Sequence, residues 1–128
     1  MNVGIRGLGA ATPSWHLDNE ALIARCGLQV SPEWIVANTG VRSRHWLEPG
    51  RTTSDLAAEA ARAALAQAGR TPAEVDRLIL ATVSPDMPTP ATATRVLAKL
   101  GARCPALDLT ATCAGFLYGL DLGAAWVR

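Results

Sequence analysis

Cys113 is the residue of this sequence whose type and surroundings best fit covalent chemistry. It follows an apolar run of strand length, residues 106–111, and precedes a helix-length stretch, so we expect it at the start of a helix. There, the helix dipole and unpaired backbone N–H groups favour a thiolate, which is the nucleophile for acyl transfer from a thioester. The small residues around it, from Ala111 to Gly115, allow a sharp turn and close approach of a substrate. A cysteine in such surroundings is also common in inert cores, so context alone leaves both interpretations open.

The other candidates for chemistry are weaker. Cys26 and Cys104 lack the helix-start setting, and we interpret both as structural. Three cysteines, an odd number without CxxC spacing, argue against a disulfide framework and a zinc site, so no metal is predicted. His16 and His45 lie in polar segments and are interpreted as surface histidines. The glycines of residues 4–9 have the wrong order for a dinucleotide fingerprint, and their expected role is close packing of a strand.

The chain alternates between strand-like and helix-like segments that must position Cys113. Strands are expected at residues 3–9, 77–84 and 106–111, with 41–47 a short strand or an extended loop. Helices are expected at residues 18–25, 31–40, 53–68, 89–100 and 113–128, with a capping-box turn at 71–74 and a proline-rich loop at 84–90. Strands separated by helices predict an α/β fold, with a mostly parallel sheet covered by helices on both faces.

The last helical segment, residues 113–128, is apolar on nearly every side. Asp121 is its only charged residue before Arg128. A helix of this kind belongs in the middle of a large protein, and a short three-strand chain cannot easily surround it. We therefore predict missing partner surface, supplied by more chain or by another subunit. The alternative is that the glycines and alanines of this segment only allow tight packing on the sheet.

Composition indicates one globular domain and excludes several classes of protein. The chain has 128 residues, 49% of them hydrophobic, and a net charge of +1 from 12 basic and 11 acidic residues. Without a basic block, neither a nucleic-acid nor a membrane partner is expected. Residues 1–11 lack the pattern of a signal peptide, and no run of roughly 18 apolar residues occurs. A cytoplasmic location is the resulting expectation.

Several segments resemble, in the correct order, the type III β-ketoacyl-(acyl-carrier-protein) synthases of the thiolase-like superfamily. They are residues 7–13 (GLGAATP), 31–44 (SPEWIVANTGVRSR), 53–69, 78–90 and 108–116 (DLTATCAGF). Together these segments extend through essentially the whole chain. The resemblance implies that residues 1–128 are the N-terminal part of a thiolase-like ketosynthase domain, an incomplete α/β fold whose C-terminal half is absent.

The resemblance also implies a reaction, in fatty acid or polyketide biosynthesis. Cys113 would accept an acyl group from acyl-coenzyme A, and a malonyl-carrier-protein thioester would lose carbon dioxide to give the carbanion that attacks the acyl thioester. The Cys113 N–H would form part of the oxyanion hole. Trp34 matches the position that stacks on the coenzyme A adenine, and Arg42 and Arg44 lie beside it, where we expect them to steer phosphate. Acyl-coenzyme A and acyl carrier protein are implied as substrates, with no bound cofactor, and a homodimer or a complementing C-terminal half as partner.

Three departures from the family pattern qualify this reading. Asn38 occupies the place of an arginine that contacts coenzyme A, which makes a carrier-bound or different acyl donor more plausible. Thr89 replaces a large aromatic found in some members, leaving room for a longer or branched acyl chain. The family's catalytic histidine and asparagine lie in the C-terminal half, and neither His16 nor His45 matches them.

The third departure leaves three hypotheses open. The chain is a fragment of an active ketosynthase, a non-catalytic fragment that binds a partner chain or acyl carrier, or a non-decarboxylating acyltransferase of the same superfamily. In each case we expect the isolated chain to be unable to perform the condensation.

Overall fold

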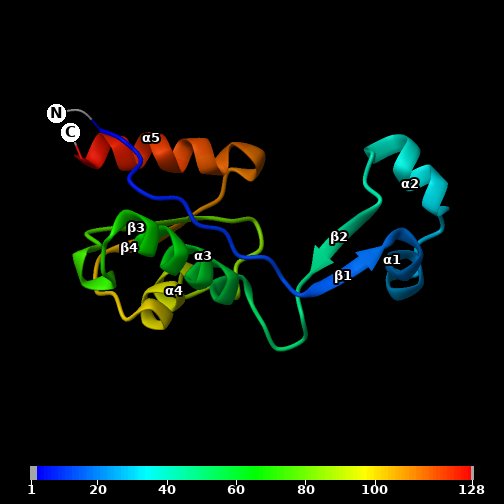
Figure 1. Ribbon diagram of the computed structural model, residues 1–128, viewed down its shortest axis with the longest axis horizontal. Helices are drawn as coiled ribbons and strands as arrows, with labels where there is room; N and C mark the ends of the chain where they lie inside the picture. Colours follow the sequence, from blue (N-terminus) through cyan, green and yellow to red (C-terminus); the bar gives the residue numbers. More distant parts are fainter. Residues whose placement is uncertain (1–2, 128) are drawn as a thin grey trace. The chain divides into compact units, whose positions relative to one another are not determined.

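The computed structural model describes residues 3–127, which divide into two compact units (Figure 1). The smaller unit is Thr12–Arg51, and the larger contains the chain up to Ala11 and from Thr52 onward.

The smaller unit pairs two short strands and two helices. Strand β1 (Trp15–Asp18) leads directly into α1 (Asn19–Cys26), and α2 (Pro32–Thr39) is followed by β2 (Ser43–Trp46). The two strands are antiparallel, with Trp15 opposite Trp46 and His16 opposite His45. Strand β2 lies within residues 41–47, for which a strand or a loop was expected, whereas β1 was not predicted. A four-residue strand whose partner lies some 28 residues further along carries little local signal of its own.

Both helices of this unit begin and end where the sequence places them. The Asp18 carboxylate accepts a hydrogen bond from the Ala21 N–H at 2.8 Å, and the Ser31 hydroxyl accepts one from the Trp34 N–H at 3.1 Å. Each helix then stops at a glycine in the left-handed conformation, Gly27 for α1 and Gly40 for α2. The caps confirm the predicted boundaries because they satisfy backbone groups that each helix end leaves open.

The larger unit is built around two parallel strands. Its elements are α3 (Thr53–Ala68), a 3₁₀ turn (Pro72–Glu74), β3 (Leu78–Ala81), α4 (Thr92–Leu100), β4 (Ala106–Leu109), a second 3₁₀ turn (Thr112–Ala114) and α5 (Gly115–Val127). Strands β3 and β4 run parallel, with Leu78 opposite Ala106. In Figure 1, α5 lies on one side of these strands and α3 and α4 on the other. This arrangement confirms the predicted parallel sheet with helices on both faces.

The buried core of the larger unit lies between α3, α4 and the sheet. Its buried members are Ala58, Val96, Leu97, Leu100 and Ala102, against which Leu78, Leu80 and Ala106 pack. The small side chain of Ala58 lets α3 approach α4 closely. The apolar side of α4 is buried in this core, and its removal from water stabilises the packing of α4 in the larger unit.

The predicted strand at residues 3–9 is wrong. These residues form no strand, and the side chains of Val3, Ile5 and Leu8 are exposed. The glycines do serve close packing, but against a helix. A Cβ atom on Gly9 would lie 2.2 Å from the Ala60 carbonyl oxygen of α3. The segment therefore packs its backbone against α3 instead of pairing with a strand.

Two predicted helix starts also shift. The helix expected from residue 89 begins at Thr92, and the one expected from Cys113 begins at Gly115 after the 3₁₀ turn. Ala91, at the N-cap of α4, has no side chain able to cap it. The cap comes instead from Asp108, on β4, which no local pattern could indicate.

Replacing Gly9 by alanine should destabilise the larger unit. The new methyl group would clash with the Ala60 carbonyl and lie 2.4 Å from the Ala64 nitrogen, so the segment must leave α3. We expect the free energy of unfolding to fall by about 2 kcal/mol, as in other overpacked sites. Urea denaturation measures this loss. Gly4→Ala is the matched control, because nothing lies within 4 Å of its added Cβ; equal losses in both variants would contradict the packing role.

A carboxylate fixes the loop after β3 to the start of α3. Asp86 accepts hydrogen bonds from the Ser54 N–H at 3.0 Å and the Ser54 hydroxyl at 2.6 Å, and its carboxylate lies 3.1 Å from Arg95 Nε. Burial of the carboxyl opposes ionisation, but the Ser54 hydrogen bonds and the Arg95 charge outweigh it and lower the pKa of Asp86. The loop between β3 and α4 is therefore held by an ionised group.

This lowered pKa predicts acid sensitivity. A carboxyl group whose pKa is lower in the folded chain than in the unfolded chain stabilises the fold. This contribution is fully present when the pH is above the pKa of the unfolded chain, about 3.9, and it is lost as the pH falls through the pKa of the folded chain. We expect stability to decrease below about pH 4, and to decrease less steeply in Asp86→Asn, which has no charge to titrate there. Urea unfolding at pH 7 and pH 3 compares the two chains. An unchanged pH dependence in the variant would exclude Asp86 as a source.

Candidate active site

Cys113 lies in a tight turn between the end of β4 and the start of α5. The 3₁₀ turn Thr112–Ala114 is closed by hydrogen bonds from the Ala114 N–H to the Ala111 carbonyl at 3.0 Å and from the Gly115 N–H to the Thr112 carbonyl. These bonds do not use the Cys113 N–H. The thiol is exposed. The strand–turn–helix order predicted for Cys113 is confirmed, with the thiol just before the helix and not within it.

The residue before the cysteine has an unusual backbone. Thr112 has φ 45°, in the left-handed region that a β-branched residue rarely adopts. Such a conformation costs of order 1–3 kcal/mol and persists only where the surrounding structure imposes it. Here it is imposed between a paired strand and a 13-residue helix. The turn thus projects Cys113 from the carboxyl end of the sheet, a feature that the residue types alone do not reveal.

A pocket opens beside the thiol. It has a volume of about 380 Å³ and is lined mainly by apolar side chains, namely Ile79, Ala81, Thr112, Cys113, Phe116, Gly119 and Leu120. Glycines on one side of α5 allow the helix to lie on β3, since a Cβ at Gly115 would be 3.3 Å from the Ala81 methyl group. An apolar pocket next to an exposed thiol suits an acyl chain bound as a thioester. Phe116 is a pocket residue that the sequence analysis did not single out, although it follows the predicted nucleophile by only three positions.

Asp108 ties this turn to a second helix. Its two carboxylate oxygens accept hydrogen bonds from the Thr92 and Ala93 N–H groups, both at 2.7 Å. The first residues of α4 are buried, so these N–H groups have no access to water. A carboxylate at a helix N-terminus also interacts favourably with the helix dipole. Asp108 therefore fixes β4, and with it the turn that carries Cys113, against α4.

The other two cysteines differ from each other. Cys104 is half-buried, and burial, with a smaller effect from the charge of Asp76, raises the pKa of its thiol. A thiol held protonated is a poor nucleophile, in keeping with the structural role expected for Cys104. Cys26 is exposed at the last position of α1, so it is no buried structural residue.

Three predicted substrate-binding residues lie in the smaller unit. Trp34 is 54% exposed on α2, and the Asn38 side chain donates a hydrogen bond to the Trp34 carbonyl at 2.8 Å. Arg42 is exposed beside α2, next to Pro32 and Val36. These three side chains are accessible on and next to one helix. The Asn38 side chain is thus turned back onto its own helix.

Arg44 does not have the role expected of it. Its guanidinium donates hydrogen bonds to the Asn19 side-chain oxygen at 2.6 Å and to the Leu17 carbonyl at 3.3 Å. The group is half-buried. It joins β2 to β1 and α1, so it supports the fold of the smaller unit instead of offering a free cation to phosphate.

The remaining predicted residue, Thr89, is exposed in the loop between β3 and α4. It does not line the pocket beside Cys113. Cys113 and Thr89 belong to the larger unit, and Trp34, Asn38 and Arg42 to the smaller. The structure thus brings together the predicted binding residues of the smaller unit, but it does not place Thr89 in the pocket beside the thiol.

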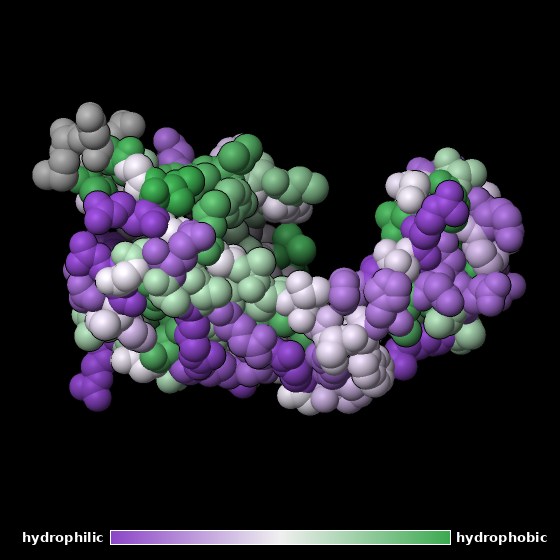
Figure 2. Space-filling model, viewed as in Figure 1, coloured by the Kyte–Doolittle hydropathy of each residue, from purple (hydrophilic) through white to green (hydrophobic). Residues whose placement is uncertain are grey.

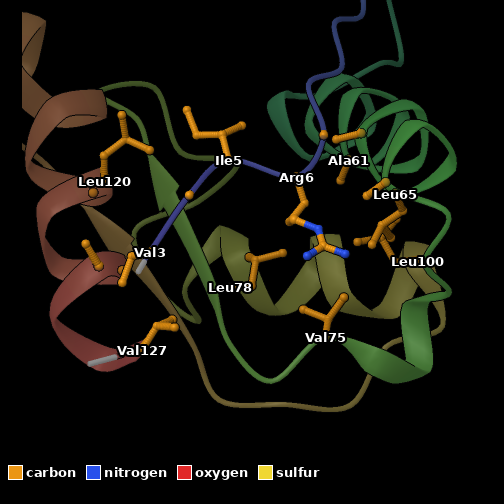
Figure 3. Close-up of a pocket in the computed structure, with 17 residues that line it drawn as sticks. Val3, Ile5, Arg6, Ala61, Leu65, Val75, Leu78, Leu100, Leu120 and Val127 are labelled. Atoms are coloured by element: carbon orange, nitrogen blue, oxygen red, sulfur yellow. The ribbon is translucent and has the colours of Figure 1, made fainter. Parts of the chain in front are cut away.

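A larger apolar cavity of about 760 Å³ lies elsewhere in the larger unit (Figure 3). It is bounded by the N-terminal segment, α3, β3 and α5, and Figure 3 shows the Arg6 side chain extending into it toward Leu78. None of the predicted site residues lines it. Size alone therefore does not identify the active site.

Helix α5 leaves much apolar surface uncovered. Phe116 and Leu117 are 66% and 65% exposed, and Gly115 is the one buried residue among those described in α5. Apolar side chains gather over this helix in Figure 2. This exposure matches the surface that the sequence analysis expected to need a partner.

Solved structures that share this arrangement of strands, turn and cysteine show the class of fold. The 3-oxoacyl-(acyl-carrier-protein) synthase III of Aquifex aeolicus superposes with a TM-score of 0.89 and 35% identity, over 98% of this chain and 40% of that one. The priming β-ketosynthase of the R1128 polyketide pathway superposes with a TM-score of 0.84 and 33% identity, over 92% and 35% of the two chains. The fold is therefore thiolase-like, represented by its N-terminal part.

Sequence comparison then identifies the family. The chain is 46% identical over 125 residues to a β-ketoacyl-(acyl-carrier-protein) synthase III of Sphingopyxis alaskensis, covering 97% of this chain and 38% of the relative. No protein-family model matches. This chain is a homologue of the N-terminal portion of the type III β-ketoacyl-(acyl-carrier-protein) synthases, and it spans little more than a third of the length of the curated relatives that it matches. Within residues 3–127, no helix is long and apolar enough to cross a membrane.

Proposed function

We propose that Cys113 accepts an acyl group from a thioester, as the first step of a decarboxylative condensation with a malonyl-carrier-protein thioester. The thiolate attacks the thioester carbonyl, the carbon–sulfur bond of the donor breaks, and the donor leaves as a free thiol once protonated. The resulting acyl-enzyme is the electrophile for the condensation. Acyl-coenzyme A or acyl carrier protein is the donor class that this chemistry requires.

The observation that carries this proposal is the exposed Cys113 thiol in a tight turn beside an apolar pocket. An acyl chain of modest length fits a volume of about 380 Å³, with Ile79 and Phe116 as apolar walls. The Cys113 N–H, which the turn's own hydrogen bonds leave unused, is available to the developing oxyanion. Homology to type III ketosynthases over nearly the whole chain supports the same assignment.

The smaller unit supplies the proposed donor site. Trp34 offers an exposed aromatic face for an adenine ring, and Arg42 offers a cation for phosphate. Asn38 gives no charge at the position where the family pattern has arginine, so we propose weaker reliance on coenzyme A and greater reliance on an acyl carrier protein. The small Thr89 is proposed to tolerate longer or branched acyl chains.

The proposal is tested by intact-protein mass spectrometry of the chain before and after exposure to acyl-coenzyme A and acyl carrier protein donors of increasing chain length. We expect one adduct of acyl mass, formed more readily from the carrier protein than from coenzyme A. A folded chain that stays unmodified with every donor would exclude acyl transfer by this chain alone.

A non-catalytic role is the second candidate, favoured by one observation. The apolar side of α5, with Phe116 and Leu117 strongly exposed, is a surface suited to a partner chain. The mass measurement separates the candidates, because a binding fragment forms no acyl adduct. A third possibility, acyl transfer without decarboxylation, is distinguished by following the acyl group to an acceptor while measuring released carbon dioxide.

A further inference from the structure

The smaller unit places its two histidines directly opposite each other. His16 on β1 and His45 on β2 are cross-strand partners, and their ring centroids are 5.4 Å apart in an edge-to-face arrangement. Both side chains are exposed. They lie 29 positions apart in the sequence, so only the antiparallel register brings them together.

One of the rings is held in a defined state. His45 Nδ1 lies 2.8 Å from the Pro13 carbonyl oxygen, and a carbonyl can only accept a hydrogen bond, so Nδ1 carries a proton. In the neutral ring, Nε2 then carries the lone pair. A histidine whose second nitrogen donates to a backbone carbonyl is the usual arrangement of a metal ligand, since that bond fixes the tautomer and the ring orientation. The His16 ring makes no hydrogen bond within residues 3–127 and is free to turn.

The spacing of the rings suits a shared ion. Two imidazoles bound to one Zn²⁺ at Zn–N distances of about 2.0–2.1 Å, in tetrahedral geometry, have ring centres roughly 5 Å apart. The observed separation is 5.4 Å. No hydrogen bond among the described residues holds the His16 ring, so none has to break for that ring to turn toward a shared ion.

The charges around the paired strands β1 and β2 favour a cation on the face that carries the histidines. Successive residues of a strand point to opposite faces, so Asp18 shares the face of the histidines while Arg44 lies on the other. Arg25 also belongs to the other face, where its guanidinium lies 5.1 Å from the Trp15 ring and 6.0 Å from the Trp46 ring. Of the two charged residues of β1 and β2, Asp18 therefore shares the histidine face and Arg44 does not; the Asp18 carboxylate also accepts the capping hydrogen bond from the Ala21 N–H.

We propose that His16 and His45 form a two-imidazole site for a divalent late transition metal such as Zn²⁺, Ni²⁺ or Cu²⁺. Imidazole nitrogen is a preferred ligand of these ions. No third protein ligand completes a metal cluster among the described residues, so water fills the remaining positions. The site is distinct from the proposed acyl-transfer residues, and it would fasten β1 to β2.

The test titrates the tag-free chain with ZnCl₂ while NMR follows the two imidazole rings. The titration is made in a Cys26→Ser, Cys113→Ser background, so that the two exposed thiols do not compete for the ion. We expect both rings to shift together and to saturate at one equivalent, with a rise in Tm because the ion binds the folded chain. His16→Asn and His45→Asn should each weaken binding at least tenfold. Ser43→Ala changes a residue of β2 on the same face as the two histidines, and it should leave the affinity unchanged.

Three results would overturn the site: ring signals unmoved by Zn²⁺, a shift in one ring only, or full affinity retained in either histidine variant. The rings of the unaltered histidines decide the first two, so the test does not depend on a variant that folds.

Discussion

Cys113→Ala should form no acyl adduct with any thioester donor, while Cys26→Ala should be acylated like the unaltered chain. The alanine removes the sulfur atom that the proposal makes the acyl acceptor, so the loss is complete instead of partial. Cys26 is the matched control because its thiol is also exposed, yet it lies at the end of a helix and does not line the pocket beside Cys113. Mass spectrometry of the intact chains, followed by peptide mapping of the adduct, measures both outcomes.

The opposite pattern would refute the assignment. An adduct that persists in Cys113→Ala and disappears in Cys26→Ala would show that acylation reports simple thiol exposure. Folding of both variants is checked by circular dichroism, since neither substitution removes a buried group.

Asp108→Ala should destabilise the larger unit by about 3 kcal/mol, because two hydrogen bonds to a charged acceptor are lost, each contributing about 1.5–3 kcal/mol. The Thr92 and Ala93 N–H groups would remain buried without another acceptor among the described residues. Asp108→Asn should lose less, since its amide oxygen can still accept one of the two bonds. Urea unfolding gives the free energies directly.

Asp121→Ala provides the control for this loss of a negative charge. Asp121 is exposed on α5, and its replacement should change stability by no more than about 0.5 kcal/mol. If Asp108→Ala proved as mild as the control, α4 would have to be capped by something other than this carboxylate.

The parts of the fold that the sequence predicted are those with local physical causes. Asp18 and Ser31 cap their helices with their own side chains, and glycines in the left-handed conformation end them, so the boundaries follow from neighbouring residues. Residues 3–9 were assigned to a strand because their apolar composition suits one. The contact that decides their place is with α3, more than 50 residues away.

The candidate active site was likewise predictable only where its causes are local in the sequence. The position of Cys113 between strand and helix was predictable because both elements adjoin it in the sequence. The support given by Asp108 was not predictable, since its hydrogen bonds join β4 to α4, which are separate in the sequence. The strained backbone of Thr112 was not predictable either, because it is a property of conformation and not of residue type. The role of Arg44 could not be predicted from its neighbours in the sequence, because its partners Asn19 and Leu17 are brought near it only by the pairing of β1 with β2.

The polar contacts around the site form one continuous series. Ser54 donates to Asp86, the Asp86 N–H donates to the Thr92 hydroxyl at 2.9 Å, and the Thr92 N–H donates to Asp108. Each member has its hydrogen-bonding groups satisfied only while its neighbours stay in place, so α3, α4 and β4 cannot detach one at a time without leaving buried groups unpaired. The elements that hold the Cys113 turn should therefore open and close cooperatively, as a single unit of local unfolding.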